Sequence, residues 1–350
     1  MPRRLFLVLL FGAALAGTAA RTGIADPALR PWLLNEDGRT GRSPDPAIDA
    51  VVNRIAADIQ KVETQHGTLL VHSTGVPSYP VGPFGDRNPS IPSDRHWLFR
   101  IPLEPEPARD PQRTSLGPIG TLVNGVPIYN PLDAFSYRNR GVWNQNAVVA
   151  RAAGHDASLG HPSPSGGAVI PGTRFIAGAY HHHQLPPALL EQLGAASPQS
   201  HSPIIGYAFD GYPIYGPYGF AHPDGSGGVR RIASSYRLRE MTTRIALPDG
   251  TVLSPEDTGP PVDLRYPLGF FVEDYEFVEG LGDLDSHNGR FRVTPGYPQG
   301  TYAYFATIGE DGRGAFPYYL GMEAYGKIAG GDNRRQGRGA GPGGRPRPRI

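Results

Sequence analysis

Short runs of apolar and aromatic residues, bounded by glycine, proline or asparagine, recur along the middle of the chain. Such runs are typical of β-strands joined by turns. Helical spacing of apolar residues is limited to 45–62 and 186–194, and the second half of 45–62 equally suits the start of a strand. The pattern predicts an all-β fold, a sandwich or distorted barrel of short hairpin strands with one or two short helices. The runs are GTLLVHSTGVPSYPVG (67–82), HWLFRIPL (96–103), GPIGTLVNGVPIYNP (117–131), SPIIGYAFDGYPIYGPYG (202–219) and GTYAYFATI (300–308).

Two of these runs contain a similar octapeptide. NGVPIYNP (124–131) and DGYPIYGP (210–217) share a turn dipeptide, a proline, Ile-Tyr and a closing proline, and Asn-Gly and Asp-Gly favour tight hairpin turns. A weaker similarity links GAYHHH (178–183) with GTYAYF (300–305). Two similar hairpins are enough to explain the first pair, and the four segments do not establish a duplicated domain.

The first twenty residues resemble a secretory signal peptide. Arg3 and Arg4 precede an apolar run, and small residues follow, which places cleavage after Ala16 or Ala20. The apolar run is short for a membrane span, and no other stretch is long enough, so we expect no transmembrane segment in the mature chain. The sequence therefore predicts a secreted or periplasmic protein of the cell envelope. RRLFL (3–7) also resembles a twin-arginine signal, so the choice between the Sec and twin-arginine routes stays open.

The rest of the chain divides by composition into three parts. An N-terminal segment (21–59) precedes the predicted β domain (60–328), and residues 329–350 form a tail rich in arginine, glycine and proline. This tail composition predicts disorder. A basic tail suits contact with an anionic cell surface, and the alternative is a solvated tail with no specific role.

Composition excludes several kinds of site. There is no cysteine, which rules out disulfides, thiolate metal sites and a cysteine nucleophile. With three methionines, a thioether site for Cu(I) is not expected. The net charge of +1 argues against nucleic acid as a partner.

Histidines are concentrated in one region of the chain. If 178–183 is a strand, His181 and His183 share one face, and Tyr180 and His182 share the other. His161 and His201 lie in turn sequences. Imidazole and carboxylate groups suit Zn(II) or Cu(II), so we expect a site for a divalent metal ion, and the alternative is a chance cluster of exposed histidines. The predicted ligands are His161, His181, His183, His201 and Asp210.

No familiar catalytic motif is present. The chain has no G-x-S-x-G elbow, no H-E-x-x-H helix and no phosphate-binding loop, so whether it is an enzyme stays open. A second hypothesis is a non-enzymatic module that binds carbohydrate or a surface through exposed aromatic rings. Its stacking faces would be Trp143, Tyr212, Tyr215 and Tyr218.

Four segments together resemble the YHYH domain family. They are 116–137, 141–150, YHHHQLPP (180–187) and HSPIIGYAFDGYPIYGPYG (201–219). The resemblance implies an exported protein without a settled enzymatic activity. It also implies that residues 180–183 form the tyrosine-histidine element for which the family is named.

The chain departs from the family pattern at several positions. Ser158 and Ala188 stand where the resemblance implies cysteines, so a family disulfide would be missing. Arg290, Ala303 and Phe305 stand where it implies histidines. We therefore expect the first histidine cluster to be kept and a second one to be absent.

Overall fold

The computed structural model describes residues 27–86, 88–114, 116–163, 167–195 and 197–328. The predicted signal peptide and the basic tail lie outside this part of the chain. Across the described ranges no helix combines the length and apolar character that crossing a membrane requires. Strands dominate, as predicted. The α-helices are α1 (Pro46–Val52), α2 (Ala147–Ala150) and α3 (Pro187–Gln192), and the short 3-10 helices are η1 (Pro27–Leu29), η2 (Tyr137–Asn139), η3 (Ala152–Gly154) and η4 (Val272–Asp274). The strands are β1 (Ile59–Gln65), β2 (Thr68–Ser73), β3 (Ser90–Pro92), β4 (Trp97–Pro102), β5 (Pro107–Arg113), β6 (Pro118–Leu122), β7 (Pro127–Tyr129), β8 (Leu132–Ser136), β9 (Asn144–Asn146), β10 (Gly160–Ser163), β11 (Ile176–His182), β12 (Ile204–Ala208), β13 (Pro213–Tyr215), β14 (Tyr218–Phe220), β15 (Val229–Arg231), β16 (Tyr236–Leu238), β17 (Tyr275–Phe277), β18 (Gly289–Thr294), β19 (Tyr297–Phe305) and β20 (Glu323–Gly326).

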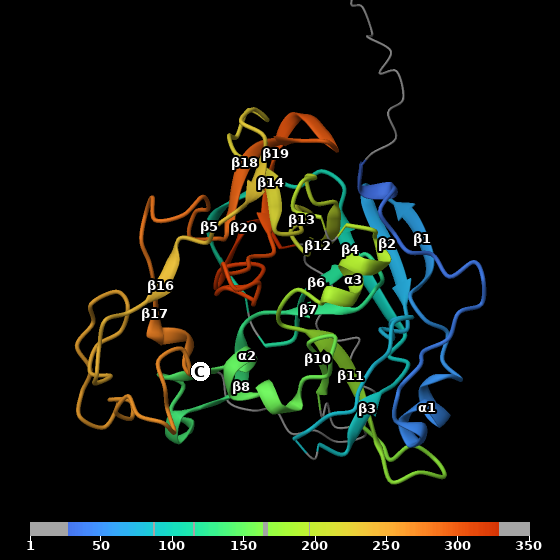
Figure 1. Cartoon of the computed structure of the whole chain (residues 1–350), viewed down its shortest axis with the longest axis horizontal. Helices are drawn as coiled ribbons and strands as arrows, with labels where there is room; N and C mark the ends of the chain where they lie inside the picture. The colour runs from blue at the N-terminus through green and yellow to red at the C-terminus, as the bar shows by residue number, and fades with distance from the viewer. Residues whose placement is uncertain (1–26, 87, 115, 164–166, 196, 329–350) are drawn as a thin grey trace, which may run out of the picture.

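A nine-stranded sheet forms the centre of the described structure, and it does not close into a barrel. Its order is β10-β11-β7-β6-β12-β13-β19-β18, with β3 added beside β11. A second sheet, β1-β2-β4, packs against it through a shared core that includes Phe99 on Phe209 at 5.8 Å and Trp32 on Tyr207 at 5.7 Å between ring centres. The arrangement is the sandwich-like alternative of the two predicted, with β1, β2 and β4 on one flank in Figure 1.

The predicted N-terminal segment joins the same core. Ile48 and Val52 on α1 and Trp32 before it are buried among residues of both sheets. The sequence 45–62 is helical only to Val52 and becomes strand at Ile59, so both readings of this ambiguous stretch apply to different parts of it. Asp45 caps α1 by accepting hydrogen bonds from the backbone N–H groups of Ala47 and Ile48.

The central sheet is built from two equivalent halves. Along the strand order, pairing is antiparallel, parallel and antiparallel in each half, and the halves meet at the antiparallel pair β6–β12. At this seam Leu122 pairs with Gly206 and Gly120 pairs with Ala208. The octapeptide similarity places Gly120 and Leu122 at positions equivalent to Gly206 and Ala208, so the seam has an approximate two-fold axis.

Details outside the octapeptides repeat as well. Asp156 accepts hydrogen bonds from the backbone N–H of Gly160 and the hydroxyl of Tyr180, and Asp285 accepts the same two bonds from Gly289 and Tyr302. His182 pairs in parallel with Ile128, as Tyr304 does with Ile214. The weak similarity between 178–183 and 300–305 is therefore a repeat in three dimensions, which sequence alone did not establish.

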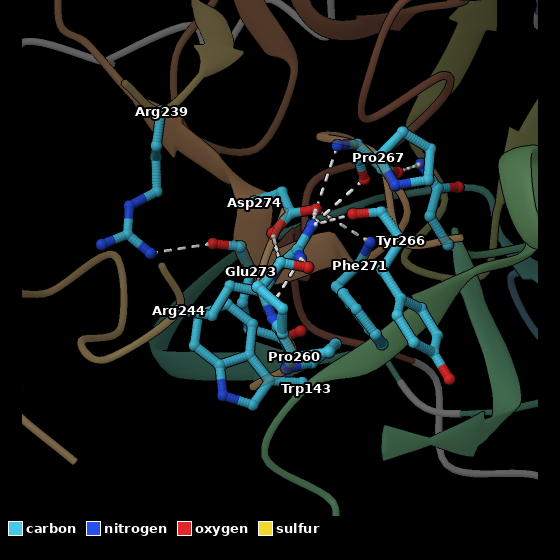
Figure 2. A network of polar contacts seen from close by, with 12 residues as sticks. Trp143, Arg239, Arg244, Pro260, Tyr266, Pro267, Phe271, Glu273 and Asp274 are labelled. Atoms are coloured by element: carbon cyan, nitrogen blue, oxygen red, sulfur yellow. Dashed lines mark hydrogen bonds and ion pairs between the residues drawn. The ribbon is translucent and has the colours of Figure 1, made fainter. Parts of the chain in front are cut away.

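The long loop region between β16 and η4 (residues 239–271) flanks this sheet, and one buried ion pair holds it in place. Arg244 and Asp274 have no exposed side-chain area, and both carboxylate oxygens lie 2.7 Å from guanidinium nitrogens. The remaining donors of Arg244 reach the carbonyl groups of 260, 261, 266 and 267 (Figure 2). The pair thereby fixes loop backbone that has few strand partners of its own.

Candidate metal centre

Three of the five predicted ligands meet on one face of the β10–β11 pair. His161 on β10 lies directly opposite His181 on β11, and His183 follows two residues later. Each of the three offers a ring nitrogen, and these nitrogens all lie within 4.8 Å of one another. The alternation of a strand explains why His181 and His183 point the same way, as predicted.

The backbone fixes which nitrogens of His181 and His183 are free. Nδ1 of His181 lies 2.9 Å from the carbonyl oxygen of Ala179, and Nδ1 of His183 lies 2.5 Å from that of Asn130. A carbonyl only accepts, so each Nδ1 carries the proton of its neutral ring. Both Nε2 atoms are then unprotonated, yet they are 3.1 Å apart. Two lone pairs at this distance repel unless a cation lies between them.

A proton is not the cation favoured at neutral pH. Burial lowers the pKa of His183 to about 4, and burial together with the neighbouring His183 lowers the pKa of His181 well below its usual value. Burial, followed by the neighbouring His181 and His183, lowers the pKa of His161 well below its usual value, and Nε2 of His161 has no hydrogen-bond partner. The three rings are therefore neutral, which is the form that binds metal. Around a tetrahedral ion with Zn–N bonds of 2.0–2.1 Å, two nitrogens would be about 3.3 Å apart, close to the separation observed.

The three histidines line a cavity of about 460 Å³. Its walls are largely apolar, with Tyr129, Leu132 and Phe135 among the lining residues. The ring of Tyr129 stacks on His181 with 3.9 Å between centres and holds that imidazole in place. The volume falls in the range of small-molecule sites. A cluster of three ligands at such a cavity leaves one side of a bound ion open.

Two further histidines lie close to this cluster. His182 points to the opposite face, where its Nε2 lies 2.7 Å from the hydroxyl of Tyr79. His155 was not among the predicted ligands. Its ring centre is 4.7 Å from that of His161, and its Nε2 has no partner. The signal was its membership of the histidine-rich region, but nothing in the sequence placed it beside β10.

His201 and Asp210 do not join the cluster. Asp210 is buried and accepts hydrogen bonds from the hydroxyl of Tyr304 and the backbone N–H groups of Tyr212 and Gly326, so its oxygens are already in use. His201 packs on Tyr215, in the other half of the sheet. Both predictions depended on loops whose positions the sequence does not fix. The seam between β6 and β12 separates them instead.

The stacking faces of the second hypothesis are mostly inside the protein. Trp143, Tyr212 and Tyr215 are at most 5% exposed, and Tyr218 alone of the four is partly accessible. The prediction that these rings form an exposed platform is wrong. Tyr212 and Tyr215 belong to the DGYPIYGP hairpin (210–217), whose aromatic rings pack in the core.

Comparison with known proteins supports the family resemblance found in the sequence. The family model described as YHYH protein matches residues 98–312, well over half of the chain. The chain belongs to the YHYH family. No curated protein and no solved structure matches it. In the segment Tyr180–His183, which the resemblance equates with the tyrosine-histidine element of the family, His181 and His183 join His161 in the cluster, and Tyr180 and His182 hydrogen-bond on the opposite face.

The second half of the YHYH fold lacks the equivalent cluster. Strand register places Arg290 opposite Ala303, as His161 is opposite His181. Phe305 occupies the position equivalent to His183. The second half of the sheet thus has no imidazole at the three positions equivalent to His161, His181 and His183. This agrees with the departures from the family pattern in the sequence.

Proposed function

We propose that this YHYH protein binds one divalent transition metal ion, zinc or copper, through His161, His181 and His183. The observation that carries the proposal is the 3.1 Å approach of two unprotonated Nε2 atoms, with a third unpartnered imidazole nitrogen nearby. Imidazole ligands suit both metals. Three protein ligands with one open position is the arrangement of catalytic rather than structural zinc sites.

The open position gives the proposed site a chemical role. A metal ion there would supply a Lewis acid at the floor of the cavity, and the apolar walls would select what reaches it. The chain's own contribution is to orient the rings, by the two carbonyl acceptors and by Tyr129. We further infer that the protein acts outside the cytoplasm, which rests on the signal-like sequence of residues 1–20 alone.

The test is metal content measured by mass spectrometry on the purified full chain after supplementation with zinc or copper. We expect about one ion per chain, and its loss in His161→Ala, His181→Ala and His183→Ala. Cobalt(II) serves as a spectroscopic probe, because its visible absorption reports coordination geometry independently of any activity.

Matched controls come from the neighbouring histidines. His201→Ala and His155→Ala should keep most of the metal, since neither residue reaches all three clustered nitrogens. His182→Ala should also keep it, provided that circular dichroism shows a folded variant. Equal retention of metal in all six variants would exclude the cluster as the site. A parent chain that stays metal-free after supplementation would exclude the proposal altogether.

A further inference from the structure

The second half of the sheet contains a buried cation where the first half gathers imidazoles. Arg292 on β18 has no exposed area, and its guanidinium lies over the ring of Phe305 at 4.7 Å from the centre. Phe305 is the residue equivalent to His183. The guanidinium therefore lies against the residue that replaces a proposed metal ligand, and no metal is needed to place a positive charge there.

The hydrogen-bonding capacity of Arg292 is largely unused. One terminal nitrogen, Nη2, donates to the carbonyl oxygen of Phe220, and Nη2 of Arg290 donates to the same oxygen at 2.9 Å. Nε and Nη1 of Arg292, and Nε of Arg290, are buried without any partner. A buried guanidinium with two unpaired donor groups is costly unless an acceptor reaches it.

The arginines around Arg292, namely Arg230 and Arg290, both pair with the single carboxylate of Asp283. Arg230 binds Asp283 with two nitrogens, and Arg290 approaches the same carboxylate at 3.6 Å. Among the described residues Arg292 has no ion-pair partner. Arg230 and Arg290 therefore share the carboxylate of Asp283, and Arg292 is left without one in the described part of the chain. Burial, followed by the charge of Arg290, lowers the pKa of Arg292 to about 9, as expected for a cation without a counter-ion.

The cluster of Arg230, Arg290 and Arg292 extends to the protein surface beside the β14–β15 hairpin. Figure 1 shows β14 beside β18 and β19, and the contacts of Phe220 with Arg290 and Arg292 place the hairpin over β18. The side chains of Arg290 and Arg230 are 13% and 47% exposed, so the three arginines lead from the surface to the buried group. The connecting loop contains Gly225, Gly227 and Gly228, all with positive φ.

We propose that the arginine cluster Arg230, Arg290 and Arg292 binds an oxyanion, with Arg292 as the buried anchor. A guanidinium fork matches the paired oxygens of carboxylates and phosphates. The two halves of the sheet would thus carry sites of opposite preference, a cation in the first half and an anion in the second. The proposal does not depend on metal binding.

The test is calorimetric titration of the full chain with sodium phosphate and, separately, sodium acetate, at ionic strength held constant with chloride. We expect saturable binding of at least one of them at one site per chain. Binding of phosphate alone indicates a tetrahedral anion, and binding of acetate alone indicates a carboxylate. Arg292→Met and Arg290→Met should each weaken binding by tenfold or more. Arg237→Met, at an exposed arginine paired with Glu276, and His181→Ala should not.

A stability measurement separates binding from a purely structural role. Replacing an uncompensated buried charge by an apolar side chain is often neutral or stabilising, so Arg292→Met in phosphate-free buffer should melt at or above the temperature of the parent. If Arg292 had a purely structural role, Arg292→Met would melt at a lower temperature than the parent. If Arg292→Met does not fold, the partly exposed Arg290→Met decides alone. No saturable binding of either anion, or binding unchanged in the arginine variants, would overturn the proposal.

Discussion

Removing the guanidinium of Arg244 should cost more stability than any surface substitution in this protein. In Arg244→Met the carboxylate of Asp274 stays buried with only backbone donors, since the N–H groups of Gly269 and Phe271 remain at 3.0 and 3.2 Å. Four carbonyl groups also lose their donor. Breaking a fully buried ion pair by deleting one partner costs about 3–5 kcal/mol. That is a large share of the roughly 5–15 kcal/mol typical of folded proteins.

The assay is urea unfolding followed by tryptophan fluorescence and by circular dichroism. Trp143 reports locally, because its Nε1 donates to the carbonyl of Asp257 within the same loop region, 3.1 Å away. Arg237→Met is the matched control, since this arginine is 52% exposed in its ion pair and such pairs contribute about 0–1 kcal/mol. An early fluorescence transition, with the far-ultraviolet signal retained, would indicate that the loop region unfolds separately. A loss no larger than in Arg237→Met would refute the reasoning.

Three further predictions concern the seam, acid stability and the N-terminus. Gly206→Ala should destabilise by about 1–3 kcal/mol, because its Cβ would lie 2.5 Å from the carbonyl oxygen of Thr121 across the seam, whereas Gly296→Ala, with no atom nearer than 3.4 Å, should have little effect in the same thermal melts. Burial, helped by Arg292 and Arg290, lowers the pKa of His201 to about 4, so the unfolded chain takes up a proton first and stability falls as pH drops from 6.5 towards 4. In His201→Gln the midpoint of urea unfolding should therefore fall less steeply between pH 6.5 and 4 than in the parent. An unchanged dependence of the midpoint on pH would contradict the lowered pKa of His201. N-terminal sequencing of protein from the cell envelope should start near residue 17 or 21, and a retained Met1 would contradict export.

The sequence correctly predicted those structural features that depend on the pattern of neighbouring residues. Turn-bounded apolar runs correctly indicated an all-β fold, and strand alternation correctly separated His181 and His183 from His182. The two hairpins were expected from Asn-Gly and Asp-Gly, and in the structure Gly125 and Gly211 take positive φ at these turns. Each of these results depends on neighbours within a few residues.

Long-range pairing could not be predicted in the same way. Whether His201 or His155 reaches the β10–β11 pair depends on strand order, which no single segment encodes. The octapeptide repeat held the missing information, because equivalent hairpins on either side of a seam place Asp210 at the counterpart of Asn124 rather than beside His181. The burial of Tyr212 and Tyr215 also depends on long-range pairing, since Tyr212 packs on Tyr302 and Tyr325, and Tyr215 packs on Phe305.

The seam also has a consequence for the ancestry of the fold. Because β6 and β12 are equivalent strands that pair antiparallel about a two-fold axis, a chain containing only one half would present an edge complementary to itself. Two copies of such a chain would pair as the halves do here and form a symmetric homodimer with two identical pockets. Joining the copies in one polypeptide removes the requirement for identity. One half can then keep its histidines while the other half carries arginines, an outcome that a homodimer encoded by one gene cannot reach.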